Sequence, residues 1–505
     1  MATRNARDPA KRSRTLSAAE QRPIVLATVG ATNAAIAFAA LTLGILAPSA
    51  TRAGTQPLAN VPGASQLQSD TGQSVQTTCQ KMAPLNGEGQ LNGLSQQLFF
   101  RCRELVQTAP GTPKDNTLGL TDPQLNGALQ QVATEESAAL GSRATQITTA
   151  RMGNVVGRLA ELRRGVTGFR ISLIDLGNQN AMMADNFDSD AVLTGGAASG
   201  DLASEGRLSG FLNVRYGFGK KDASAREDGY DFDNWGVTGG MDYRLTDDLT
   251  VGGAVSYSKL NADFKQSGYE VSGGSADSDG WGILAYGTYS KNSFYVDGLL
   301  GYGQVSNDLS RRIFYVAGAD AQGTSTADGG VRQFSGKADP NSTDFTASLG
   351  AGFDYNQGAL NYGPYARLTY YNVEVDSYSE RGTGALELAM HVQDQSIDSF
   401  TSALGARLAY AVSQPFGVLI PQGFVEWIHE YSNDARTIEA TYIYDPFQVP
   451  LIANTNDPDR DYASLGVGIS AVLPRGMQMF LNYQAVLGFS DLEENLFVGG
   501  IRAEF

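Results

Sequence analysis

From Arg207 to Phe505, apolar and polar residues alternate in one segment after another. In WGVTGGMDYRL (235–245), Trp235, Val237, Gly239, Met241, Tyr243 and Leu245 form one face, and Thr238, Asp242 and Arg244 form the other. A period of two is typical of β-strands, because successive side chains point to opposite sides of a sheet. The pattern continues into the final ten residues, LFVGGIRAEF, so we expect a strand there as well.

The alternation predicts twelve antiparallel strands. Their ranges are 207–219, 232–245, 249–265, 277–290, 293–311, 342–356, 359–378, 396–413, 417–432, 460–473, 477–490 and 494–505. Even strand numbers are the rule in single-chain bacterial barrels. We therefore expect an all-β transmembrane barrel of 12 antiparallel strands at 207–505, with a short α-helical N-terminal region before it.

Three features favour a membrane barrel over a soluble β-sandwich, whose strands also alternate. Short connections alternate with long ones, and aromatic residues cluster near the strand ends, as in the interfacial girdles of outer-membrane barrels. The expected inner face is polar and mixed in charge, which a sandwich core could not bury cheaply. Its charged residues are Asp242, Asp297, Asp354, Glu426, Arg215, Arg244, Arg367, Arg407 and Arg502.

The composition agrees with membrane strands, whose alternation of apolar and polar residues keeps the mean hydropathy low. Glycine (59 residues) and aromatics (22 Tyr, 22 Phe, 3 Trp) are abundant among 505 residues, whereas the mean hydropathy is only −0.21. No apolar run long enough for a membrane helix occurs beyond residue 60. The net charge of −16 argues against a nucleic-acid partner, which would require a basic surface.

The N-terminus is typical of an exported protein. Residues 24–46 carry no charge, follow the basic KRSR (11–14), and precede the small residues of APSATRAG, so we predict a signal peptide at 1–53. The alternative is an uncleaved inner-membrane anchor. Residues 54–75, rich in Ser, Gln and Gly, are expected to be flexible within a short exported segment at 54–120.

Two helices are predicted before the barrel. The first covers about 91–108, and the second, at 121–176, begins at TDP with Thr121 or Asp122 as its N-cap. Its second half is basic, with Arg143, Arg151, Arg158, Arg163, Arg164 and Arg170. One interpretation is a solvated face. The other is a pore plug whose Arg143, Arg151 and Arg158 pair with Asp242, Asp297, Asp354 and Glu426 in the lumen. A Gly/Ala/Ser linker is expected at 177–206.

Cys79 and Cys102 are the only cysteines. An even pair in an exported protein predicts one disulfide, with two free thiols as the alternative. The only histidines, His391 and His429, lie about 300 residues away, so we expect no metal site.

At DGYDFDNWGVTGGMDYRLTDDLTVGGAVSYSK and WGILAYGTYSKNSFYVDGLLGYG, the sequence resembles the translocator β-domain of autotransporters (type V secretion). The resemblance covers about residues 205–505. It implies a twelve-stranded barrel with a helix across its pore, located in the outer membrane among lipid and lipopolysaccharide. It also implies help from periplasmic chaperones and the barrel assembly machinery, and a C-terminal insertion signal made here by Gly500, Ala503 and Phe505.

Three functions remain open from the sequence. The first is surface display of a small helical passenger for adhesion or assembly, with an unknown surface ligand and a homo-oligomer possible. The second is a barrel whose N-terminal helices stay in the periplasm as a plug, an oligomerisation element or a contact to the cell wall. The third, an enzyme, is disfavoured because no set of nucleophile, base and orienting group can be assembled, and no cofactor is expected.

Overall fold

The computed structural model describes residues 57–503 apart from 113–116, 134–135, 164–168, 176–206, 228, 266–272, 317–330, 433, 458, 474–476 and 489–494. These residues belong to one compact unit, Thr55–Phe505. The predicted signal peptide at 1–53, the linker at 177–206 and Phe505 lie outside the described residues.

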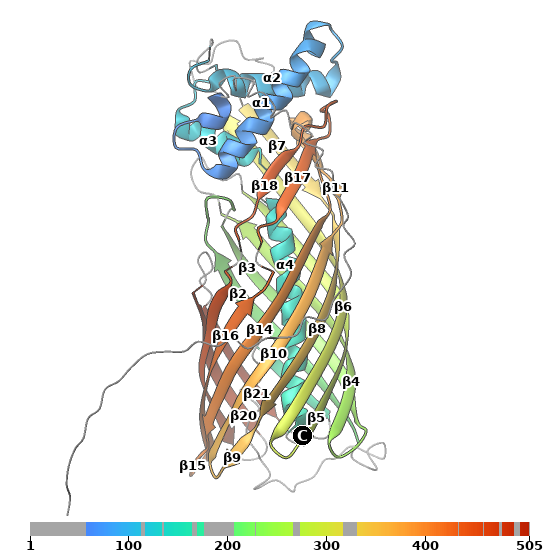
Figure 1. Ribbon diagram of the computed structural model, residues 1–505, viewed down its shortest axis with the longest axis vertical. Helices are drawn as coiled ribbons and strands as arrows, with labels where there is room; N and C mark the ends of the chain where they lie inside the picture. Colours follow the sequence, from blue (N-terminus) through green and yellow to red (C-terminus); the bar gives the residue numbers. More distant parts are fainter. Residues whose placement is uncertain are drawn as a thin grey trace, which may run out of the picture. The chain divides into compact units, whose positions relative to one another are not determined.

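The alternating segments form one large, mostly antiparallel sheet (Figure 1). Each of the twelve expected ranges overlaps one strand that pairs antiparallel with the next. These strands are β2 (Leu208–Lys221), β3 (Tyr230–Arg244), β4 (Leu249–Phe264), β5 (Gly274–Lys291), β6 (Phe294–Val316), β8 (Asn341–Phe353), β10 (Leu360–Val375), β14 (Gln395–Tyr410), β16 (Gly417–Glu430), β19 (Asp461–Leu473), β20 (Met477–Leu487) and β21 (Asn495–Ala503). The predicted β-rich fold class with N-terminal helices is confirmed.

The sheet has 17 strands, because five others join it. Four are β7 (Val331–Ala338), β9 (Tyr355–Gln357), β12 (Arg381–Gly384) and β15 (Val412–Gln414). The fifth, β1 (Phe169–Asp175), pairs parallel with β2 and antiparallel with β21, the latter through Ser172↔Arg502 and Leu173↔Ile501. A closed barrel of twelve strands therefore stays a prediction.

Four α-helices and a 3₁₀ turn precede the sheet. They are η1 (Pro57–Asn60), α1 (Gln66–Gly87), α2 (Gly93–Thr108), α3 (Asp122–Gln131) and α4 (Glu136–Arg163). Capping boxes start α1 at Ser65 and α3 at Thr121, where the backbone N–H of Thr121 donates to Gln124 Oε1 at 2.9 Å. None of the described helices is both long and apolar enough to cross a membrane.

Two of our expectations about this region were wrong. Residues 66–75, expected to be flexible, begin α1, whose buried face is made largely of small and polar side chains that hydropathy does not reveal. Its Gly72 lies so close to the Leu58 carbonyl that a Cβ would overlap it. The single helix expected at 121–176 is two helices and a strand: α3 ends at Gln131, and α4 packs first in the headpiece core, through Leu140, and then inside the large sheet, through Leu159.

The long connections form structure of their own. A second sheet contains β11 (Tyr378–Ser379), β13 (Met390–Val392), β17 (Thr437–Tyr442) and β18 (Leu451–Asn454), and η3 (Leu386–Leu388) lies beside it in the chain. We call the headpiece the unit made of η1, α1–α3, this second sheet, η3, β7, β12 and the adjacent end of β6. One continuous apolar core joins its helices to its strands.

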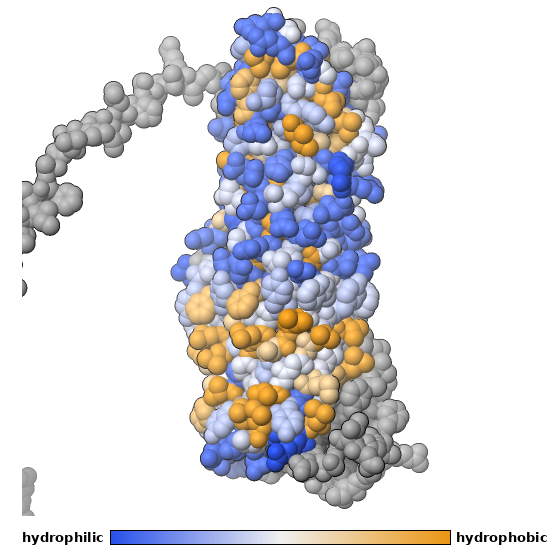
Figure 2. Space-filling view, turned by 90° about the vertical axis from the view of Figure 1, so that its right-hand side faces the viewer, coloured by the Kyte–Doolittle hydropathy of each residue, from blue (hydrophilic) through white to orange (hydrophobic). Residues whose placement is uncertain are grey.

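An apolar band crosses the visible face of the other part of the large sheet (Figure 2). Exposed aliphatic side chains fill it, among them Val255, Ile283, Leu300, Leu349, Leu368 and Leu404. Exposed aromatics border it: Trp235, Tyr257, Trp281, Tyr302, Phe345, Tyr370 and Phe400 on one side, and Tyr243, Tyr289, Phe294, Phe353, Tyr362 and Tyr410 on the other. From Trp281 to Tyr289, β5 rises roughly 27 Å at about 3.4 Å per residue, which suits the height of a bilayer core once the strand is tilted.

Candidate functional site

The candidate site is the interior of the large sheet, where α4 lies (Figure 1). Val155 and Leu159 of α4 are fully buried against a cluster that includes Phe211 of β2 and Leu299 of β6. The alternation of the strands gives an interior that combines polar and apolar side chains, and α4 contacts both kinds. Beside this apolar contact, α4 makes three sets of ionic contacts with the strands.

The central contact joins Arg158 to Asp242 of β3. Arg158 donates from Nε to Asp242 Oδ1 at 2.9 Å and from Nη2 to Oδ2 at 2.6 Å, and neither side chain is exposed. Arg158 also donates to Ser209 Oγ at 3.1 Å, while Tyr286 donates its hydroxyl to Asp242 Oδ1 at 2.8 Å. A bidentate ion pair with additional hydrogen bonds fixes both the rotation of α4 about its axis and its position along that axis.

The second contact joins Arg151 to Asp344 of β8, with Nη1 donating to Oδ2 at 2.6 Å between two buried side chains. Gly303 of β6 makes this contact possible, since a Cβ there would overlap both the guanidinium and the carboxylate. Because glycine has no side chain, the backbone at this position leaves room for the Arg151 guanidinium.

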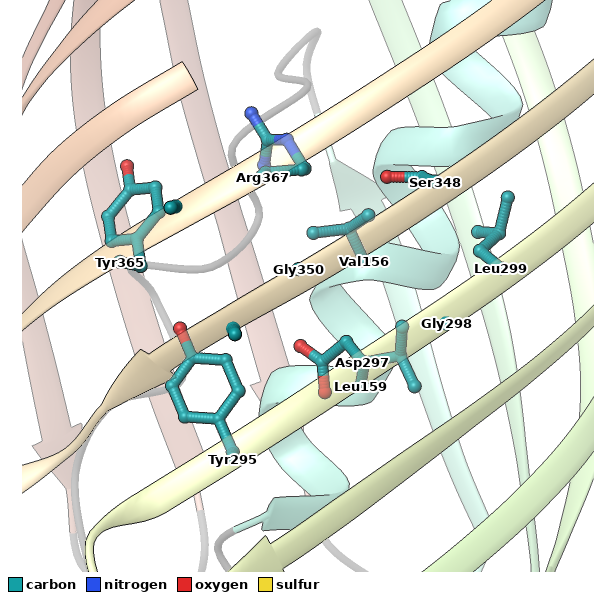
Figure 3. Close-up of a pocket in the computed structure, with 12 residues that line it drawn as sticks. Val156, Leu159, Tyr295, Asp297, Gly298, Leu299, Ser348, Gly350, Tyr365 and Arg367 are labelled. Atoms are coloured by element: carbon teal, nitrogen blue, oxygen red, sulfur yellow. The ribbon is translucent and has the colours of Figure 1, made fainter. Parts of the chain in front are cut away.

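The third contact lies near the end of α4, beside Asp297 and Tyr295, which Figure 3 labels. Arg163 pairs with Asp297 of β6 and lies 3.5 Å from Asp354, which also pairs with Arg407 of β14. The Arg163 guanidinium lies 3.8 Å from the centre of the Tyr295 ring, within cation–π range. A small cavity of about 20 Å³ adjoins Asp297, Val156 and Leu159, large enough for about one water molecule.

The predicted lumen residues can be compared with these contacts. Asp242, Asp297 and Asp354 contact α4, whereas Glu426 pairs with Arg367 of β10, at 2.8 Å between Nη2 and Oε1. Arg143 lies in α4, but its side chain is outside the described residues. Our lumen set omitted Asp344 and Arg163, although the alternation of Asp344, Thr346 and Ser348 along β8 was a signal for the former.

The two cysteines lie in the headpiece. Both are buried free thiols, on α1 and α2. Burial, with a hydrogen bond to the Cys79 thiol, raises the pKa of the Cys102 thiol well above its usual value. The two thiols are neighbours in the structure. Their oxidation to a disulfide stays a prediction.

The predicted insertion signal is only partly described. In β21, Gly500 pairs with Phe480 and Ala503 with Met477 of β20, whereas Phe505 lies outside the described residues. The role of these three residues in insertion stays a prediction. No group of three or more potential metal ligands occurs among the described side chains.

An apolar band around a charged interior is typical of outer-membrane β-sheet proteins. The family model "Autotransporter beta-domain" matches residues 210–484, which is more than half of the chain. The chain belongs to the autotransporter β-domain family and is an outer-membrane protein.

Curated relatives share this region at low identity. Outer membrane protein A of Rickettsia conorii is 24% identical over 299 residues, covering 58% of this chain and 14% of the relative. Esterase EstA of Pseudomonas aeruginosa is 26% identical over 243 residues, covering 46% of this chain and 33% of the relative. The chain thus spans a third or less of the length of these relatives.

Solved structures show a similar overlap. The translocator domain of autotransporter NalP from Neisseria meningitidis has a TM-score of 0.42 and 14% identity, covering 59% of this chain and 89% of that one. For the β-domain of the Bordetella autotransporter BrkA, the TM-score is 0.37 and the identity 16%, over 59% and 100% of the two chains.

Proposed function

We propose that this protein inserts its large sheet in the outer membrane and carries its N-terminal helices to the cell surface, where they are displayed. The observation that carries the proposal is the path of α4. Ser137, near its start, shares a 2.7 Å hydrogen bond with Tyr378 of the headpiece, and Arg163, at its end, pairs with Asp297, near the short turn at 292–293 between β5 and β6. The helix thus links the headpiece to the end of the sheet that carries short turns.

The orientation follows from the turns. In outer-membrane barrels the short turns face the periplasm and the long connections face outward. Figure 1 places α1–α3 at the opposite end of the sheet from β9 and β15, which lie next to two short turns. This arrangement supports a headpiece outside the cell and a helix that passes through the membrane within the sheet.

Cysteine labelling on intact cells tests the display. Glu88 is exposed in the connection after α1, and Asp247 is exposed in a short turn. A membrane-impermeant maleimide should label Glu88→Cys on intact cells and Asp247→Cys only after the outer membrane is permeabilised. The native cysteines, both buried, should give little background in the unmodified protein.

The alternative is a headpiece retained in the periplasm as a plug, oligomerisation element or cell-wall contact. It requires the opposite labelling, with Asp247→Cys reactive on intact cells and Glu88→Cys protected. That result would overturn display.

The proposed role is structural and not enzymatic. The esterase activity named for one curated relative belongs to a protein of which this chain covers 33%. Membrane lipid and lipopolysaccharide would surround the apolar band, and the barrel assembly machinery and periplasmic chaperones would act during biogenesis. The displayed helices would meet the surface ligand.

A further inference from the structure

We infer that the N-terminal helices α1–α3 are latched onto the β-domain, here the chain from Arg207 onward, by non-covalent contacts that hold them after the chain is cut, so that they form a retained cap and not a released passenger. This inference rests on the proposed function, since it concerns the fate of the displayed segment. The latch consists of a buried chain of charges, a second polar contact and a shared apolar core.

The chain of charges joins α2 to β7 and η3. Arg332 of β7, which is fully buried, donates to both oxygens of Glu104, from Nε at 2.7 Å and from Nη2 at 2.9 Å. Glu104 also accepts from Arg101 Nη1 at 3.4 Å, and Arg101 Nε donates to Glu387 of η3 at 2.7 Å. Two carboxylates thus alternate with two guanidinium groups, and each helix residue has its strongest partner on the β-domain.

A second contact joins α3 to β6. Gln131 accepts the backbone N–H of Phe314 at 2.6 Å through its side-chain oxygen, and its carbonyl accepts Arg311 Nη1 at 3.3 Å. Arg311 itself is fixed by Glu380, at 2.7 Å from Nε and 2.6 Å from Nη2. Arg311, the strand residue of this contact, is therefore already held in place by an ion pair.

Apolar contacts complete the latch. Met82, Leu98, Leu105, Leu125 and Leu129 of the helices are at most 1% exposed. They share one core with β-domain residues, among them Ile313, Phe334, Val392 and Leu451. Dissociation would expose these side chains to water and break the ion pair between Arg332 and Glu104. Buried contacts of this kind slow dissociation and are little affected by salt.

The test is a cut within the headpiece. A site for a specific protease is inserted at 113–116, between α2 and α3, and intact cells are treated with the protease. The expected result is complete cleavage on a denaturing gel, with the fragment that contains α1 and α2 still in the outer-membrane fraction after a wash in 1 M salt. Urea at a concentration that unfolds the headpiece should release it.

A matched pair of variants locates the latch. Glu104→Gln removes the carboxylate that Arg332 contacts with two hydrogen bonds in a buried site, and should raise the released fraction of the cut fragment at least about tenfold. Asp339→Asn removes the carboxylate of the exposed pair Arg381–Asp339 on the same surface of the β-domain, and should change nothing. Equal release from both variants would overturn the assigned role of Glu104. If Glu104→Gln fails to assemble, the cut protein with native side chains still tests retention.

The location of the fragment separates this inference from the proposed function. Retention at the surface supports both. Release into the medium after cutting overturns the latch and leaves surface display intact. Protection of the inserted site on intact cells, with cleavage only after permeabilisation, overturns surface display itself.

Discussion

Arg158 and Asp242 are joined by two hydrogen bonds of 2.9 and 2.6 Å, and neither side chain reaches solvent. The first belongs to a helix and the second to a strand 84 residues away in the chain. This pair lies between the Arg151 and Arg163 contacts along α4, so it is the centre of the attachment between the helix and the sheet.

Asp242→Asn should destabilise the folded protein by about 3–5 kcal/mol, because it removes the buried carboxylate that Arg158 contacts with two hydrogen bonds. The measurement is the temperature at which the folded, heat-modifiable species disappears on a gel. The control is Asp248→Asn, since Asp248 lies 3.8 Å from Lys291 in an exposed pair, which contributes at most about 1 kcal/mol. The double change Arg158→Met/Asp242→Leu should be milder than Asp242→Asn alone. Equal midpoints for Asp242→Asn and Asp248→Asn would show that the pair does not hold the helix.

Gly303→Ala should weaken the attachment of α4 through a single methyl group. The new Cβ would overlap the Arg151 guanidinium and the Asp344 carboxylate, and overpacking of this kind typically costs about 1–3 kcal/mol. Gly298→Ala on the same strand is the control, because a Cβ there meets nothing within 4 Å. The folded fraction and its midpoint should fall for Gly303→Ala only. A loss of the same size in Gly298→Ala would indicate a general effect of replacing glycine in β6.

The sequence predicted the strands better than the helices. Along β3, one period of two places Met241 outside and Asp242 inside, so the lipid-facing and interior residues can be read from the pattern. The partners of the interior charges cannot, because the strand pattern does not give the rotation of a helix that contacts several strands. The alternation along β8 predicts that Asp344 faces the interior, but its pairing with Arg151 could not be read from the sequence.

The headpiece was the least predictable region. The long connections of the strands are polar, and their ordered structure depends on helices far away in the chain, as the contact of Arg332 with Glu104 illustrates. Helix α1 was missed because its buried side includes Thr71, Gly72 and Thr78, which give no apolar period. The burial of this side of α1 depends on its tertiary contacts, which its own sequence does not reveal.

Leu349→Arg should impair insertion, because Leu349 lies in the apolar band and its side chain is 56% exposed. An arginine facing the middle of a bilayer costs about 2–4 kcal/mol in such barrels. The measurement is the amount of folded protein in the outer-membrane fraction. Gln333→Arg is the control, since Gln333 is exposed on β7 in the headpiece, outside the band. Normal insertion of Leu349→Arg would contradict the assignment of the band to the membrane.

The reduced headpiece should lose stability at alkaline pH because of Cys102. Burial raises the pKa of this thiol in the folded protein, whereas in the unfolded chain it is about 8.5. Between these two values the unfolded chain binds fewer protons than the folded one, so the free energy of unfolding is constant below about pH 8 and falls above about pH 8.5, by at most about 1.4 kcal/mol per pH unit. Urea unfolding of the headpiece under reducing conditions, followed from pH 7 to 9.5, measures this slope. Cys102→Ser should show a weaker slope. The oxidised protein should also show a weaker slope if Cys79 and Cys102 form a disulfide. Identical slopes in the reduced protein and in Cys102→Ser would contradict the prediction.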